Sequence, residues 1–212
     1  MVFFGRLRSV LVAATLVCVC AASPARAADV ELSDVEIERL NSGQVVVREE
    51  NIERGGHRYI GGVSYVLIDA RPERVSAALD NVAAYRQILP RTRSVRWIGL
   101  SRQGGEAVVE LEQGNSIAHG KYTVRVRREP SAHASDSATI RFWLDPNFSH
   151  DIADINGFFR VEPMRDKTLL TYLVMVDLGH GLIGRLFEDR IRKSALSTPA
   201  LVKTYVESRS TS

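Results

Sequence analysis

Apolar and polar residues alternate with a period of two through much of the chain between Ser94 and Gly179. In "EAVVELEQ", "KYTVRVRR" and "ATIRFWLD", apolar residues recur at every second position, which is typical of strands with one buried and one solvated face. The segments "QVVVREE", "RYIGGVSYVLIDA" and "TLLTYLVMVD" are rich in β-branched residues and also predict strands. Together these patterns predict an antiparallel sheet of about seven strands.

Three other segments have the spacing of amphipathic helices. "LSDVEIERLNSG" predicts a short leading helix over residues 32–42, with Ser33 as its N-cap and Glu36 as the capping-box partner. "RPERVSAALDNVAAYRQILP" predicts two short helices that meet at a corner. "LIGRLFEDRIRKSALSTPALVKTYVE" predicts a long C-terminal helix, with a kink where Ser197, Thr198 and Pro199 interrupt the periodicity.

The first 27 residues have the pattern of a secretory signal peptide. A basic start is followed by an apolar run of about a dozen residues and by Ala25-Arg26-Ala27. We expect cleavage after Ala27, a single mature domain over residues 28–212, and a secreted or periplasmic location. Cleavage would remove three arginines, both cysteines and no acid, which leaves 25 basic and 25 acidic residues. A mature chain without net charge gives no electrostatic indication of nucleic-acid binding.

The segment "IDARPERVSAALDNVAAYRQILPRTRSVRWIG" (residues 68–99) resembles the START-like helix-grip superfamily, also called SRPBCC. That superfamily includes polyketide cyclases, lipid-transfer domains and coenzyme Q-binding proteins, and the resemblance extends from about Val45 to Glu207. It implies an α+β fold built on a curved antiparallel sheet of about seven strands. Two short helices would follow the first long strand. A long C-terminal helix would cross the concave face, and an internal cavity would lie between sheet and helix.

The candidate ligand-binding residues are aromatic or lie on the strands expected to line this cavity. Aromatic side chains bury large areas and commonly serve core packing, so packing is the competing interpretation. Arg141 is a further polar candidate, although strand alternation places it on the face opposite Phe142. The candidates are Tyr122, His119, Phe142, Trp143, Phe159, Tyr172 and Leu186.

The stretch "FSHDIADINGFF" (residues 148–159) concentrates His150, Asp151 and Asp154 in a few positions. A metal or catalytic site is one interpretation, but the flanking Asp145-Pro146-Asn147 and Asn156-Gly157 are strong turn formers. The spacing of His150, Asp151 and Asp154 matches no strong zinc or calcium pattern. We therefore favour a loop at the cavity mouth, and we expect neither a metal nor another cofactor.

The leading functional hypothesis is an exported protein that binds or carries a hydrophobic small molecule, such as a lipid, a quinone or a polyketide-like compound. Transient contact with a membrane would accompany such a role. The alternative is a cyclase or aromatase that moves protons with Tyr122, His119 or Asp154 in the same cavity. A third possibility is an interaction protein of the cell envelope, which would present a large exposed apolar patch.

Overall fold

The computed structural model of the chain describes residues 31–101, 105–115, 119–130, 137–179 and 182–209. The expected signal peptide falls on residues outside this described part. The chain divides into two units after Leu32, and the unit Ser33–Ser212 contains all the helices and strands discussed below. No helix in the described residues is long and apolar enough to cross a membrane.

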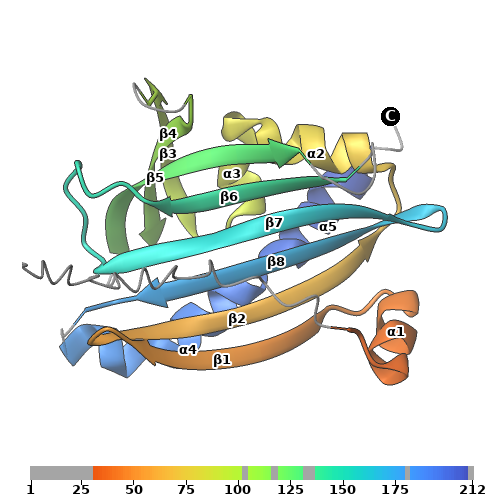
Figure 1. Cartoon of the computed structure of the whole chain (residues 1–212), viewed down its shortest axis with the longest axis horizontal. Helices are drawn as coiled ribbons and strands as arrows, with labels where there is room; N and C mark the ends of the chain where they lie inside the picture. Colours follow the sequence, from red (N-terminus) through yellow and green to blue (C-terminus); the bar gives the residue numbers. More distant parts are fainter. Residues whose placement is uncertain (1–30, 102–104, 116–118, 131–136, 180–181, 210–212) are drawn as a thin grey trace, which may run out of the picture. The chain divides into compact units, whose positions relative to one another are not determined.

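The second unit is built on one antiparallel sheet of eight strands. In chain order these are β1 (Val46–Arg54), β2 (His57–Ile68), β3 (Thr92–Leu100), β4 (Ala107–Gly114), β5 (His119–Pro130), β6 (Ala138–Leu144), β7 (Asp154–Met164) and β8 (Lys167–Asp177). They pair in the order β1-β2-β8-β7-β6-β5-β4-β3, and Figure 1 shows the sheet curving from β1 round to β3. The antiparallel fold is confirmed, with one strand more than the seven expected.

One predicted turn is wrong. Asn156 and Gly157 lie inside β7, where Gly157 pairs with Phe142 of β6 and Val174 of β8. A Cβ on Gly157 would lie 2.1 Å from the Leu173 carbonyl oxygen, so this glycine serves a close approach of strands rather than a turn. The connection between β6 and β7 therefore ends before Asp154.

The predicted leading helix is confirmed as α1 (Asp34–Asn41). Both hydrogen bonds of a capping box link Ser33 and Glu36, which satisfies two backbone donors that the first helical turn leaves without partners. The Glu36 carboxylate also accepts a 2.7 Å hydrogen bond from the Arg48 Nε on β1. Because burial in α1 is confined to Leu40, these polar contacts have a large share in tying the helix to the sheet.

The remaining helices contact the strands on one side of the sheet. Figure 1 shows α4 (Leu182–Leu196) and α5 (Thr198–Ser208) behind β2 and β8, and both helices contact β2 and β8. The two short helices predicted after β2 are present as α2 (Pro72–Asp80) and α3 (Tyr85–Ile88), joined by the 3-10 turn η1 (Val82–Ala84). Their fully buried side chains meet those of the sheet and of the C-terminal helices in one core: Val66, Ile68, Val75, Leu79, Ile88, Val161, Leu170, Leu196 and Val202.

The expected kink in the C-terminal helix separates α4 from α5 at Ser197. Pro199 has no N–H, so it cannot donate to the carbonyl one turn earlier and instead occupies the first turn of α5. The Ser197 and Thr198 hydroxyls donate to the carbonyls of Ser194 and Ala195 at 2.7 Å each. These side chains satisfy carbonyls that a continuous helix would have used, and the break lets the helices follow the curvature of the sheet.

Candidate ligand-binding cavity

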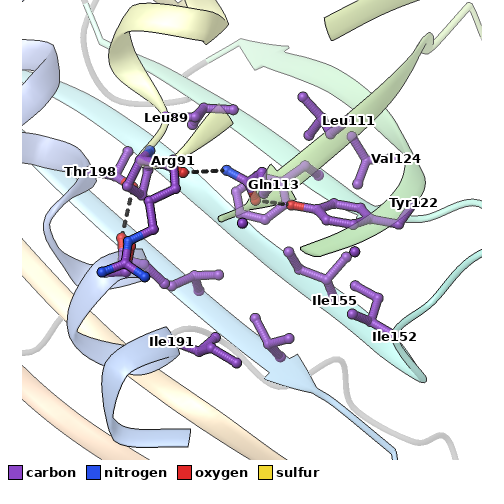
Figure 2. A pocket seen from close by; sticks show the side chains of 18 of the residues that line it. Leu89, Arg91, Leu111, Gln113, Tyr122, Val124, Ile152, Ile155, Ile191 and Thr198 are labelled. Carbon is purple, nitrogen blue, oxygen red and sulfur yellow. Dashed lines mark hydrogen bonds between the residues drawn. The ribbon is translucent and has the colours of Figure 1, made fainter. Parts of the chain in front are cut away.

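A cavity of about 410 Å³ lies between the sheet and the helices α3, α4 and α5. This volume falls within the roughly 300–1,000 Å³ that is usual for small-molecule sites. Its walls consist mainly of aliphatic side chains at alternate strand positions. Helix α4 supplies Ala195 and also Ile191, which Figure 2 shows. The strand residues are Leu111, Val124, Val126, Ile140, Ile155 and Val174.

Three aromatic rings from neighbouring strands form one wall. Phe159 of β7 and Tyr172 of β8 are paired in register and stack with ring centroids 4.5 Å apart. Phe142 of β6 lies 5.9 Å from Phe159 and 6.0 Å from Tyr172. Stacked rings of this kind give a rigid apolar surface, which suits contact with the flat or extended body of an apolar molecule.

A hydrogen-bonded pair lies at another side of the cavity (Figure 2). The Tyr122 hydroxyl of β5 donates to Gln113 Oε1 of β4, and Gln113 Nε2 donates to Pro90 O and to Thr92 Oγ1, at 3.1 Å each. Burial raises the pKa of Tyr122, with a smaller contribution from nearby Tyr172. Tyr122 therefore stays neutral, and every polar atom of the Gln113 amide already has a partner.

The second buried hydroxyl belongs to Tyr172, close to the break between α4 and α5. Burial raises the pKa of Tyr172, and a hydrogen bond with Thr198 opposes that effect in part. Both residues line the cavity. The two tyrosines can thus donate hydrogen bonds across the physiological pH range but cannot act there as bases.

Polar and charged side chains gather at the rim. His119, Asp151, Asn115, Arg91 and Arg190 all line the cavity, and each of them is exposed to solvent. The Asp151 carboxylate accepts a 2.8 Å hydrogen bond from the Lys121 N–H, which fixes the connection before β7 against β5. The rim is therefore wet and carries both signs of charge, whereas the interior is apolar.

Comparison with known proteins identifies the architecture. No family model and no curated protein sequence matches the chain. The STAR-related lipid transfer protein from Xanthomonas axonopodis superposes with a TM-score of 0.63 at 16% sequence identity, covering 77% of this chain and 93% of that chain. Human StAR-related lipid transfer protein 5 gives a TM-score of 0.56 at 11% identity, covering 82% and 91%. The Zhui aromatase/cyclase from Streptomyces sp. R1128 gives 0.54 at 17% identity, covering 77% and 96%.

This chain has the START-like helix-grip fold. The structural neighbours include lipid-transfer proteins and an aromatase/cyclase, so the fold alone is shared by proteins that carry ligands and by proteins that transform them. The function must therefore be argued from the side chains of the cavity.

The helix-grip cavity brings together most of the residues selected from the sequence. Tyr122, His119, Phe142, Phe159 and Tyr172 line it, although ligand binding by these residues stays a prediction. The side chain of Leu186 lies outside the described part of the structure.

Trp143 does not line the cavity. It follows Phe142 on β6, and successive side chains of a strand point to opposite faces, so these two residues cannot face the same cavity. Trp143 instead lies on the outer face, where the guanidinium of Arg127 is 5.3 Å from its ring centroid. Arg141 also lies outside, paired with Glu129 at 2.7 Å.

The three residues proposed for the mouth loop separate in the structure. Asp151 lines the rim, whereas the exposed His150 is not a lining residue and its Nδ1 lies 2.7 Å from the Ile152 carbonyl oxygen. Asp154 begins β7 and accepts a 2.6 Å hydrogen bond from the hydroxyl of Tyr59, whose pKa this contact raises to about 12. Among the described residues, no group of three or more His, Cys, Asp or Glu side chains is placed to hold a metal ion.

Several lining residues were not selected from the sequence. Gln113 occupies the inward register of β4 together with Leu111, so strict alternation could have placed it in the cavity. Ser194 and Arg190 recur four residues apart on α4, but their orientation depends on where the helix crosses the sheet. Arg91 follows Pro90 in a turn, and nothing in its local pattern points to a cavity.

Proposed function

We propose that the mature chain binds and carries a hydrophobic small molecule, such as a lipid or quinone, in the cavity between the sheet and α4–α5. The observation that carries this proposal is a space of about 410 Å³ with aliphatic and aromatic walls next to the hydrophobic core. Apolar surface that enters such a space contributes roughly 25 cal/mol for each Å² removed from water. Sequestration of an apolar ligand therefore needs no catalytic group.

We also propose that the carrier acts outside the cytoplasm. The support is the pattern of the first 27 residues, in which a basic start, an apolar run and Ala25-Arg26-Ala27 follow in order. N-terminal sequencing of the protein from fractionated cells tests this point. Ala28 at the N-terminus of an extracytoplasmic fraction is expected, and an intact Met1 in the cytoplasm would refute export.

The binding function is tested by native mass spectrometry of the protein purified from its own envelope, followed by organic extraction and identification of the released compound. A matched pair of variants shows whether the cavity holds the compound. Ala195→Trp places an indole into the cavity, whereas Ala77→Trp adds the same group on the exposed side of α2. We expect loss of the ligand only with Ala195→Trp. Equal retention by both variants would show that the ligand binds elsewhere.

A second function, catalysis of cyclisation, is supported by a specific feature of the same cavity. The neutral hydroxyl of Tyr172 lines it together with His119, whereas the Tyr122 hydroxyl already donates to Gln113. A donor such as Tyr172 could polarise a carbonyl while an imidazole moves a proton at the adjacent carbon. Time-resolved mass spectrometry of the extracted compound with fresh protein separates the two functions. A carrier returns the compound unchanged, and an enzyme does not.

A further inference from the structure

Two arginines that line the cavity have no carboxylate partner among the described residues. No ion pair joins Arg91 or Arg190 to another residue of the part that the structure describes. Many arginines elsewhere are paired with acids: Arg48, Arg58, Arg93, Arg96, Arg125, Arg127, Arg128, Arg141 and Arg192. Arg54, Arg71 and Arg86, which do not line the cavity, also join no ion pair in the described part of the chain. What distinguishes Arg91 and Arg190 is therefore their position at the cavity.

The backbone at Arg91 is in an unfavourable conformation for an arginine. Its φ of 54° lies in the left-handed region, which is unfavourable for a non-glycine residue. The Arg91 carbonyl accepts a 3.0 Å hydrogen bond from Gly114, so the turn is held at the end of β4. Figure 2 shows the side chain of Arg91 extending from this turn toward the junction of α4 and α5. A glycine would hold the turn at lower cost, but it would provide no cation.

Arg190 on α4 supplies the second cation. Its guanidinium lies 5.9 Å from the ring centroid of Phe187, another lining residue. The only described acidic residue that lines the cavity is Asp151, which already accepts a hydrogen bond from the Lys121 N–H. The rim therefore carries two positive charges against one negative charge.

The hydrogen bonds inside the cavity also indicate where the polar group of a ligand would lie. The Tyr122 hydroxyl and both ends of the Gln113 amide are hydrogen-bonded to protein atoms. A ligand therefore needs no polar group at that side of the cavity, and the aliphatic and stacked aromatic walls suit a hydrocarbon body. The polar group of the ligand belongs at the rim, where the guanidinium groups of Arg91 and Arg190 lie.

We propose that the ligand is an anionic amphiphile, with a carboxylate or a similar acidic head bound by Arg91 and Arg190 and an apolar body inside the cavity. This inference rests on the proposed binding function and specifies its ligand class. Guanidinium groups bind carboxylates through paired N–H donors, which ammonium groups cannot do in the same geometry.

The test compares oleate with oleyl alcohol, which has the same chain and an uncharged head. Affinities are measured by displacement of a fluorescent apolar probe from the wild-type mature protein and from the variants Arg91→Gln, Arg190→Gln and the double variant. Arg86→Gln is the matched control, because Arg86 is exposed on α3 and does not line the cavity. Thermal melts confirm that each variant is folded.

We expect the wild-type protein to prefer oleate by at least tenfold, since each charge-assisted contact is worth about a factor of ten in affinity. Each single variant should lose about that factor for oleate, while Arg86→Gln and all affinities for the alcohol change less than twofold. Arg91→Lys should restore oleate binding only in part. Equal binding of both compounds by the wild-type protein overturns the anionic head and leaves the carrier function standing. Failure of both compounds and of the apolar probe to bind overturns both proposals.

Discussion

Substitution of Gly62 by alanine should destabilise the protein strongly. A Cβ at this position would lie 2.0 Å from the carbonyl oxygen of Arg48 on β1, and the backbone φ is 139°. The blocking atom belongs to the backbone of a paired strand, so no side-chain rotation can relieve the overlap. Overpacking typically costs about 1–3 kcal/mol, and an alanine in this glycine-specific region costs a further 1–3 kcal/mol or so. The expected loss of unfolding free energy is about 2–6 kcal/mol.

Gly99→Ala provides the matched control. Gly99 has a similar φ of 150°, at an irregularity in β3, but no atom lies within 4 Å of the point that an alanine Cβ would occupy. This variant should therefore show only the cost of the backbone conformation. The difference between the two variants isolates the collision of β2 with β1, which is expected to be about 1–3 kcal/mol.

Urea denaturation followed by circular dichroism measures both variants. The slope of free energy against urea should remain constant, so that the shift of the midpoint reports stability alone. In thermal melts, each kcal/mol corresponds to roughly 2–4 °C for a domain of this size. Equal losses for Gly62→Ala and Gly99→Ala would refute the argument from close strand approach.

Two further predictions concern polar contacts. Tyr122→Phe removes the hydrogen bond to Gln113, so the free energy of unfolding should fall by about 1 kcal/mol in urea denaturation. The affinity for oleate should change less than twofold. A tenfold loss of affinity would mean that the hydroxyl contacts the ligand instead. The hydrogen bond from Arg48 lowers the pKa of Glu36 from 4.5 to about 2, so its stabilising effect is present above about pH 4.5 and is lost as the pH falls toward 2. Melting temperatures should therefore fall more steeply over this range for wild type than for Glu36→Gln, and parallel curves would contradict the assignment.

The regular elements could be predicted because their signals are local. Period-two alternation identified the strands, the Ser33–Glu36 capping box located α1, and Pro199 located the break between α4 and α5. In each case the physical cause lies within a few residues: a side chain that satisfies a backbone donor, or a missing N–H. The curved sheet with a helix across its concave face came only from the family resemblance, and the order of strands in the sheet was not predicted.

The errors arose where a distant segment decides the local structure. Asn156-Gly157 has a strong turn propensity, yet the approach of β6 and β8 makes a glycine necessary inside β7. Tertiary contacts overrode the propensity there. The selection of Trp143 had a different cause, because the alternation that already placed Phe142 inward was not applied to its neighbour.

The charged rim of the cavity could not be predicted from the sequence, because its two arginines are far apart in the chain. Arg91 and Arg190 are 99 positions apart in the sequence, and each by itself resembles an ordinary surface residue. Only the fold places both at one cavity, which they line together with Asp151. A surface arginine can turn toward water, but a ligand that fills the apolar interior would bring its head to this rim and exclude water there. Since electrostatic attraction strengthens as water is excluded, the hydrophobic body and the anionic head would reinforce each other's binding, and a ligand with only one of the two features should bind much more weakly.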